Sequence, residues 1–195
     1  MRPLFNTNPV AALVYWGTLA LWAFIEIRQG QRTREEATQR DDGSRGVIRI
    51  TAVIGILVAI NVARNVPGAR IHASRLTIFE VSLVIIWAGM ALRYWAFHTL
   101  GRYFTFVVMT SGDQPVVSGG PYRVLRHPGY AGGTLILAGI GLALGNWLSL
   151  AANTLIPLIG IVNRIRVEEA ALHASLGDGY RDFAKSRKRL IPFVW

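Results

Sequence analysis

Five apolar stretches dominate the hydrophobic pattern of the chain, and each is followed by polar or turn-forming residues. They lie at about residues 9–27, 47–62, 76–100, 128–144 and 147–162. A helix needs roughly 20 mostly apolar residues to cross a bilayer, and shorter segments are tolerated where helices pack together or the bilayer thins. The pattern therefore predicts an all-α, polytopic integral membrane protein with five transmembrane helices. The first stretch lacks a clear small-residue cleavage site, so we interpret it as a retained helix rather than a signal peptide.

The composition agrees with a membrane location and argues against several kinds of site. Hydrophobic residues make up 52% of the chain and charged residues 16%, which is too apolar for an ordinary soluble domain. The net charge is +10, but the basic residues flank the apolar stretches, so we expect membrane lipids and no nucleic acid as partners. The chain has no cysteine and only four histidines, none of them closely spaced. We therefore expect no disulfide, no cysteine nucleophile and no protein-bound metal.

The connections between the apolar stretches predict their arrangement. Only Gly145 and Asn146 separate the last two stretches, and so short a connection predicts an antiparallel helical hairpin. The chain has no internal repeat, so we expect a single membrane domain over residues 1–195. Within it, residues 1–100 are expected to form a three-helix scaffold, and residues 101–195 are expected to carry the chemistry.

The distribution of basic residues predicts the orientation in the membrane. The connections after the first and third stretches and the segment after the fifth hold most of the lysines and arginines. The opposite side receives Arg2, Arg64, Arg70 and Arg75. Because cytoplasmic connections carry the excess of positive charge, we expect the N-terminus outside and the C-terminus in the cytoplasm.

Two polar clusters interrupt the apolar background, and the predicted orientation places both on the cytoplasmic face. The first is Gly-Pro-Tyr-Arg-Val-Leu-Arg-His-Pro-Gly-Tyr at residues 120–130, and the second is Arg-Ile-Arg-Val-Glu-Glu at residues 164–169. Pro128 stands where proline is favoured at the start of a helix, and a helix N-terminus stabilises an anion. Glu168 and Glu169 offer two carboxylates that suit an ammonium group or a ribose diol. Together the clusters predict one composite site for a ligand that carries an amino group and a carboxylate.

The order and spacing of these residues resemble the isoprenylcysteine carboxyl methyltransferase family. The resemblance covers residues 100–195, whereas the first half of the chain is similar to the family only in being apolar and helical. It is carried by Gly-Pro-Tyr at 120–122, Arg-His-Pro at 126–128, Tyr130, Arg164, Glu168, Glu169, Leu172, Gly177, Tyr180 and the closing Arg-Leu-Ile-Pro-Phe at 189–193. In the family a histidine often precedes the Gly-Pro-Tyr, whereas this chain has Asp113, Gln114 and Pro115 there.

The resemblance implies a methyltransferase that uses S-adenosylmethionine and leaves S-adenosylhomocysteine as product. It implies a cofactor pocket at the cytoplasmic ends of the last helices and a lipophilic or lipidated acceptor that arrives from the bilayer, most like the carboxylate of an isoprenylcysteine-type substrate. By the same resemblance, the cofactor pocket contains Tyr122, Arg126, His127, Pro128, Tyr130 and Glu168, and the methyl-transfer centre contains Arg164 and Glu169. A carboxylate acceptor is already ionised at neutral pH, and Arg164 can orient it through two parallel hydrogen bonds. An amine acceptor would need a base, and Glu169 or His127 would then take that part.

Other functions share parts of this pattern. The alternatives are a phospholipid-amine N-methyltransferase, an NADPH-dependent membrane reductase of the sterol type and a non-catalytic membrane scaffold. The residues also have structural interpretations. Arg164 and Glu168 are four residues apart and can form an ordinary exposed helix pair, and Tyr122 and Tyr130 can be interfacial aromatics.

Three further features have expectations of their own. Residues 103–110 are expected to fold over the cytoplasmic mouth of the site. The glycine-rich residues 139–145 lie in an apolar stretch with no preceding strand, so we interpret them as helix-packing positions rather than a nucleotide-binding loop. The side chain of Arg93 is expected to extend to the cytoplasmic interface.

Overall fold

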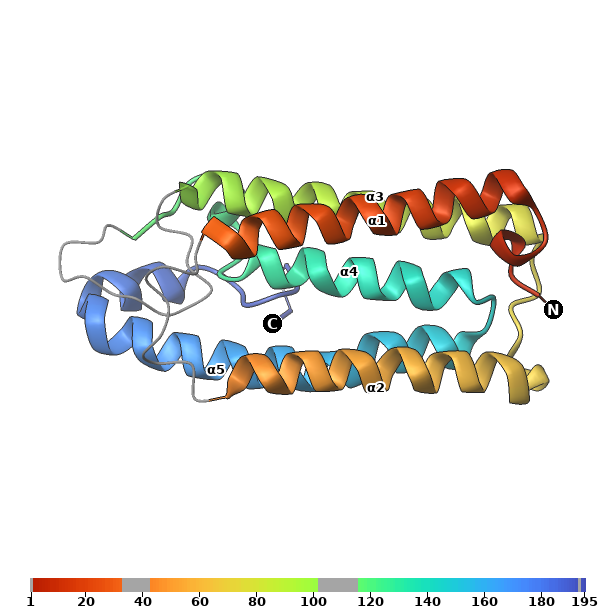
Figure 1. Cartoon of the computed structure of the whole chain (residues 1–195). Coiled ribbons are helices and arrows are strands. Elements are labelled where there is room, and N and C mark those ends of the chain that lie inside the picture. Colours follow the sequence, from red (N-terminus) through yellow and green to blue (C-terminus); the bar gives the residue numbers. More distant parts are fainter. Residues whose placement is uncertain (1, 33–42, 102–115, 193) are drawn as a thin grey trace.

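A computed structural model describes residues 2–32, 43–101, 116–192 and 194–195, and these residues are predominantly helical (Figure 1). The elements are η1 (Leu4–Asn6), α1 (Pro9–Arg32), α2 (Ser44–Asn65), η2 (Pro67–Ala69), α3 (Arg75–Leu100), η4 (Gly120–Arg123), α4 (Pro128–Ala143) and α5 (Trp147–Lys185). The described ranges contain no β-strand, and their bridges are the isolated pairs Arg70 with Asn146 and Leu125 with Lys188. The prediction of an all-α fold is confirmed.

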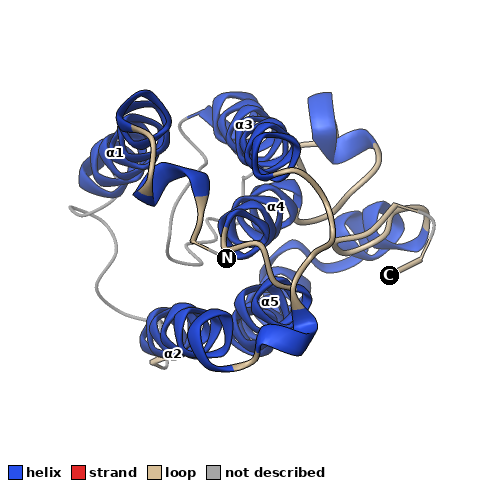
Figure 2. Ribbon diagram, turned by 90° about the vertical axis from the view of Figure 1, so that its right-hand side faces the viewer, coloured by secondary structure: helices blue, strands red, loops and turns tan. Residues whose placement is uncertain are grey.

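Each of the five predicted apolar stretches forms a helix, although one of them is short. Four helices, α1, α2, α3 and α5, are long and apolar enough to cross a membrane. The fourth, α4, is apolar but has only 16 residues, and at 1.5 Å per residue it is about 24 Å long. It lies between α3 and α5 in the end view (Figure 2), where neighbouring helices rather than lipid cover much of its surface.

Helix α5 is much longer than the predicted fifth stretch. The hydrophobic pattern ends near residue 162, but the helix continues to Lys185, so a boundary drawn from hydropathy underestimates the helix. The reason is that the polar cluster at 164–169 is itself helical and packs against other polar groups of the protein. At Gly177 the backbone leaves the helical region with φ +53°, and the last part of α5 turns back toward the bundle (Figure 1).

The long helices form a curved row rather than a closed ring. Helix α3 packs on α4, α4 packs on α5, and α5 packs on α2. Helix α1 joins the other end of the row through a core in which Phe5, Ala11 and Tyr15 meet Phe79 and Ile86. The order across the molecule is therefore α1, α3, α4, α5, α2, with α1 and α2 at the two ends (Figure 2).

The helical hairpin predicted from the short connection is present. Gly145 adopts φ +69° in the turn between α4 and α5. The side chain of Asn146 accepts hydrogen bonds from the backbone N–H groups of Leu148 and Ser149 at 2.9 and 3.1 Å, and it donates one to the carbonyl of Val66 at 2.9 Å. This buried residue therefore caps α5 and ties the hairpin to the end of α2.

Glycines allow α4 to approach its neighbours closely. A Cβ atom on Gly139 would lie 2.8 Å from the carbonyl oxygen of Ser82 on α3, and one on Gly141 would lie 2.9 Å from that of Ser149 on α5. Gly89 and Gly132 face each other across α3 and α4 in the same manner. These contacts confirm the interpretation of residues 139–145 as packing positions, since small residues let helix backbones meet in a membrane.

Replacing Gly89 with alanine is expected to destabilise the α3–α4 contact by about 1–3 kcal/mol, the usual cost of overpacking. The new Cβ would lie 2.6 Å from the carbonyl oxygen of Gly132, which is backbone and cannot rotate away. Denaturation in mixed micelles, followed by tryptophan fluorescence, measures the change. The matched control is Gly17→Ala on α1, where nothing lies within 4 Å of the new atom. Equal stability of the two variants would contradict the prediction.

Candidate active site

The loop from η4 to α4 is held in place by the C-terminal segment. The backbone N–H groups of Arg126 and His127 donate to the carbonyls of Lys188 and Arg189 at 2.7 and 3.0 Å. Pro128 then begins α4, as predicted. The two sequence clusters and the end of the chain thus meet at one end of the bundle.

The adjacent carboxylates of Glu168 and Glu169 have different partners, because consecutive helix positions point in directions about 100° apart. Glu169 is buried and accepts from Arg126 Nη1 at 2.6 Å and from Arg189 Nε at 2.9 Å. Glu168 accepts from Arg164 Nε at 2.9 Å and from the hydroxyl of Tyr130. The two glutamates therefore hold different parts of the cluster: Glu169 holds Arg126 and Arg189, and Glu168 holds Arg164 and Tyr130.

The imidazole of His127 lies between these two carboxylates. Its Nδ1 is 3.6 Å from Glu168 Oε2, and its Nε2 is 3.4 Å from Glu169 Oε1. The ring is buried, so it is not a solvated interfacial histidine.

Arg164 is the most deeply buried charged residue that the structure describes, with 2% of its surface exposed. Besides Glu168, it donates from Nη1 to the hydroxyl of Ser44 on α2 at 2.6 Å and from Nε to the hydroxyl of Tyr130 at 3.3 Å. An ordinary exposed helix pair does not have these properties. The simple structural interpretation of Arg164 and Glu168 is therefore wrong, because the guanidinium joins three helices inside the protein.

Tyr122 is also buried in protein and is not an interfacial aromatic. Its ring belongs to an apolar cluster with Ala96, Tyr180 and Phe183, and its carbonyl accepts from Arg187 Nε at 2.8 Å. Burial, with a further contribution from the negative charge of Glu168, raises the pKa of the Tyr122 hydroxyl above its ordinary value. The Tyr122 side chain is therefore neutral, and its hydroxyl is close enough to the polar cluster to be affected by the charge of Glu168.

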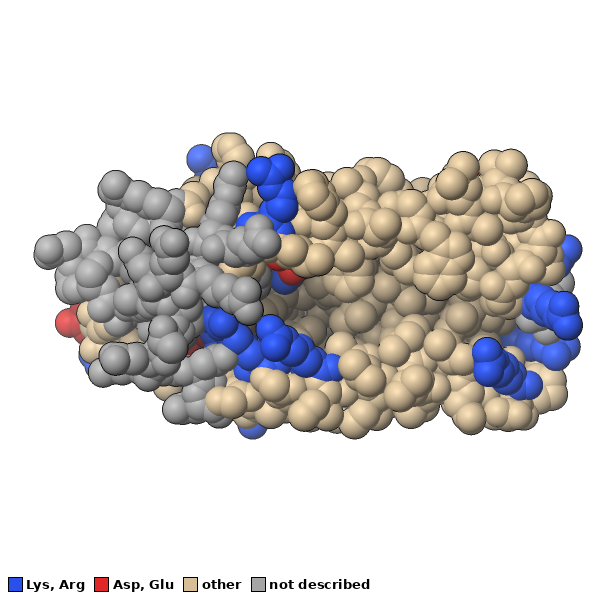
Figure 3. Space-filling view, viewed as in Figure 1, with Lys and Arg blue, Asp and Glu red and all other residues tan. Residues whose placement is uncertain are grey.

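A cavity of about 630 Å³ lies beside the polar cluster, between the two ends of the helix row. The space-filling view shows the surface hollowed between α1 and α2, with basic side chains along part of the rim (Figure 3). Its lining consists of Trp22, Glu26, Ile27 and Gly30 of α1, Arg45, Ile48, Arg49 and Ala52 of α2, Arg93 of α3, Tyr130, Gly133 and Leu137 of α4, and Ile161 and Arg164 of α5. Tyr130 and Arg164 belong to both the cavity and the polar cluster, so these two side chains form the boundary between them.

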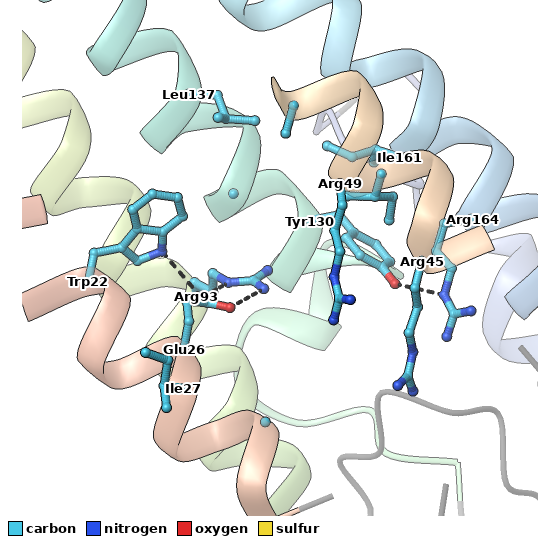
Figure 4. Close-up of a pocket in the computed structure, with 14 residues that line it drawn as sticks. Trp22, Glu26, Ile27, Arg45, Arg49, Arg93, Tyr130, Leu137, Ile161 and Arg164 are labelled. Carbon is cyan, nitrogen blue, oxygen red and sulfur yellow. Dashed lines mark hydrogen bonds and ion pairs between the residues drawn. The ribbon is translucent and has the colours of Figure 1, made fainter. Parts of the chain in front are cut away.

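Glu26 and Arg93 form an ion pair on one wall of this cavity (Figure 4). Arg93 donates from Nη2 to Glu26 Oε2 at 2.8 Å and from Nη1 to the carbonyl of Gly129 at 2.7 Å. The expectation that Arg93 extends to the cytoplasmic interface is wrong, because its guanidinium turns inward to a carboxylate that lies 67 residues earlier. The pair fastens the end of α1 to α3 and to the start of α4.

All eight residues predicted for the site lie within this end of the molecule, but they do not share one compartment. Arg164 and Tyr130 line the cavity, whereas the carboxylate of Glu169 points to Arg126 and Arg189, away from the cavity lining. The expectations for residues 103–110 and for Asp113, Gln114 and Pro115 lie outside the described residues.

Several residues of the site were missed by sequence reasoning. Glu26, Arg45 and Arg49 come from the part predicted to be scaffold, and Arg187 and Arg189 come from the end of the chain. The closing Arg-Leu-Ile-Pro-Phe motif contained a usable signal for Arg189. A glutamate inside an apolar stretch is the corresponding signal for Glu26, since intramembrane acids are costly unless paired.

The known proteins that are similar to this chain carry related names. Residues 81–174 match the model of the isoprenylcysteine carboxyl methyltransferase (ICMT) family. A probable protein-S-isoprenylcysteine O-methyltransferase from Oryza sativa subsp. japonica is 34% identical over 116 residues, which cover 58% of this chain and 61% of the relative. Protein-S-isoprenylcysteine O-methyltransferase A from Arabidopsis thaliana is 30% identical over 130 residues, which cover 66% of this chain and 64% of the relative. The chain thus spans about three fifths of the length of these curated relatives.

The fold also resembles that of a solved structure. The eukaryotic intramembrane Ras methyltransferase ICMT aligns with a TM-score of 0.64 and 20% sequence identity over 98% of this chain and 70% of the other. This likeness supports the membrane fold. The sequence match covers part of α3, η4, α4 and much of α5, and it includes all eight predicted site residues. The chain is therefore similar to the isoprenylcysteine carboxyl methyltransferase family over residues 81–174.

Proposed function

We propose that the chain is a membrane methyltransferase that uses S-adenosylmethionine to methylate the carboxylate of a lipophilic, isoprenylcysteine-type acceptor. The observation that carries the proposal is the position of Arg164. Its side chain contacts Glu168 and Tyr130 of the polar cluster and also lines the cavity between α1 and α2. The polar cluster and the largely apolar cavity therefore meet at the buried guanidinium of Arg164 and the adjacent Tyr130.

The polar cluster has a donor set that suits the proposed cofactor. S-adenosylmethionine would supply a methyl group on a positively charged sulfur. Glu168 is suited to its ammonium group, Arg126 to its carboxylate, and the buried His127 and Tyr122 to its less polar parts. Arg126, His127 and Glu168 are in hydrogen-bonded or ion-paired contact within the cluster, so their side chains are already oriented for mixed-charge recognition.

On the acceptor side, Arg164 is proposed to orient the carboxylate oxygen. A guanidinium matches a carboxylate in two parallel hydrogen bonds, and a carboxylate is ionised at neutral pH, so no base is required. Correct alignment of two reactants contributes roughly 7–11 kcal/mol to lowering a barrier. Glu169, which is already engaged by Arg126 and Arg189, is better suited to organising the loop than to accepting a proton.

We also propose that this end of the bundle faces the cytoplasm, with the N-terminus outside. The support is the excess of lysine and arginine in the connections that lead to the site and in the C-terminal segment, which is the bias expected of cytoplasmic connections. The acceptor would then enter from the bilayer through the cavity, and the cofactor from the cytoplasm.

The test is methyl transfer by the detergent-purified protein from labelled S-adenosylmethionine to an N-acetylated, S-farnesylated cysteine. The expected product is a methyl ester, which mild base hydrolyses to volatile labelled methanol. Base-stable label in phosphatidylethanolamine would instead indicate amine methylation, and oxidation of NADPH with a sterol would indicate a reductase. Either of these results without ester formation would contradict the proposal.

Cofactor recognition can be tested separately from methyl transfer by measuring the affinity for S-adenosylhomocysteine. We expect His127→Ala and Glu168→Gln each to weaken S-adenosylhomocysteine binding by about tenfold, since each removes a charge-assisted contact of the cluster. Isothermal titration calorimetry in detergent measures the affinity. His72→Ala, which alters an exposed histidine in the α2–α3 connection at the opposite end of the bundle, is the matched control. Wild-type affinity in both site variants would overturn the assignment of the polar cluster as the cofactor site.

A further inference from the structure

The cavity is strongly cationic on its α2 wall. Four arginines and one acid, Glu26, are among its lining residues. Glu26 is engaged by Arg93 on the opposite wall, and Arg164 is engaged by Glu168. Arg45 and Arg49 are the charged side chains that α2 contributes to the cavity lining (Figure 4).

The two arginines of α2 place like charges about one helical turn apart. Arg45 and Arg49 are four residues apart on α2 and thus lie on one face of the helix. Like charges at this spacing repel each other and destabilise a helix by a few tenths of a kcal/mol. Arg49 is exposed and has no ion-pair partner among the described residues. An anion in the cavity would relieve the repulsion and engage Arg49.

The other end of the cavity is apolar. Ala52 lies seven residues beyond Arg45 on α2, and Leu137 lies seven residues beyond Tyr130 on α4. At 1.5 Å per residue, each step is about 10 Å along the bundle. The cavity is therefore polar at the end that meets Arg164 and apolar about 10 Å away, which fits an acidic headgroup attached to a hydrocarbon chain.

We propose that Arg45 and Arg49 bind the acidic headgroup of the methyl acceptor and select it over uncharged and amine-bearing amphiphiles. This inference rests on the proposed function for the identity of the ligand, a carboxylate on a lipid chain. Arg45 and Arg49 hold the headgroup at the cavity wall, and the carboxylate passes to Arg164, which lines the same cavity. The selectivity for acid would then reside on α2, outside the segment 81–174 that matches the family.

The experiment measures equilibrium binding in detergent without cofactor, so it does not depend on methyl transfer. The probes are N-acetyl-S-farnesylcysteine, its uncharged methyl ester and the anionic lipid phosphatidylglycerol, each competing with a fluorescent farnesyl analogue. The wild-type protein is expected to bind the acid about tenfold more tightly than the ester, as for a charge-assisted contact. R49Q is expected to remove this preference while leaving ester affinity unchanged, and R49K is expected to retain most of it.

Arg45→Gln provides a second test on the same helix face, and Arg64→Gln, an exposed arginine near the other end of α2, is the control with the same charge change. Equal affinity of the wild-type protein for acid and ester would overturn the proposal. So would loss of phosphatidylglycerol binding in R49Q with unchanged binding of the acid, since the arginines would then recognise a membrane lipid. Acid-selective binding that depends on Arg49, without any ester formation, would support this inference and contradict the proposed methylation. Ester formation with no effect of R49Q on acid binding would support the proposed methylation and contradict this inference.

Discussion

Replacing Arg164 with methionine is expected to reduce methyl transfer to the farnesylated cysteine by about 100-fold or more. Removing one preorganised donor from a reacting oxygen typically costs about 100-fold to 1,000-fold in turnover, and Arg164 is the cation at the boundary of the two compartments. The loss should appear mainly in kcat if Arg164 aligns the carboxylate and the headgroup is bound by other residues. Initial rates over a range of acceptor concentrations separate kcat from KM.

Arg164 also has a structural part, so a second variant is needed. Methionine leaves Glu168 without a guanidinium partner and removes the hydrogen bond to Ser44. Arg164→Lys keeps a positive charge beside Glu168 but loses the planar fork that binds a carboxylate in two parallel hydrogen bonds. We expect this variant to regain most of the thermal stability lost in Arg164→Met while its kcat stays at least about tenfold below wild type.

Arg166→Met is the matched control, because Arg166 lies two residues further on α5 and is exposed. It should retain wild-type kcat. Full activity in Arg164→Lys would mean that charge alone is sufficient and would contradict the orienting part assigned to the guanidinium. A common loss of activity in Arg164→Met and Arg166→Met would point to the total charge of α5 instead.

Local and periodic signals in the sequence predicted most of the architecture. Apolar stretches gave the positions of the helices, the Gly145–Asn146 connection gave the hairpin, and Pro128 gave the start of α4. The meeting of the two polar clusters followed from the alternation of membrane sides. The contacts of His127 with Glu168 and Glu169 are consistent with that inference.

The partners inside the cluster were not predictable in the same way. The two glutamates are adjacent in sequence, and only the rotation of the helix decides that one meets Arg164 and the other Arg126. The Glu26–Arg93 pair depends on how α1 lies against α3, and no periodicity within either helix specifies that contact. Hydropathy likewise ended the fifth stretch where the side chains became polar, although the helix continued.

The Glu26–Arg93 pair gives the largest expected effect on stability. Glu26→Ala should lower the free energy of unfolding by about 2–4 kcal/mol, slightly less than the cost of breaking a fully buried ion pair, because this pair is half-buried and lines the cavity. The side chains of Arg93 and Glu26 are only 15% and 25% exposed, and the hydrogen bond to the carbonyl of Gly129 does not neutralise the guanidinium. The end of α1 would also lose its polar attachment to α3. Denaturation in mixed micelles, monitored by tryptophan fluorescence, gives the change.

A double variant distinguishes an uncompensated charge from a simple loss of contacts. Glu26→Leu combined with Arg93→Met removes both charges and leaves apolar side chains of similar length, and such replacements of a buried pair are often neutral or stabilising. We therefore expect the double variant to be more stable than Glu26→Ala, although it contains more substitutions. Glu80→Ala, which removes an exposed acid from α3, should leave stability within about 0.5 kcal/mol of wild type. If Glu26→Ala and Glu80→Ala have the same free energy of unfolding, the ion pair does not fasten α1. If the double variant is the least stable of the three, the contacts of Glu26 and Arg93, rather than their charges, hold the end of α1 against α3 and α4.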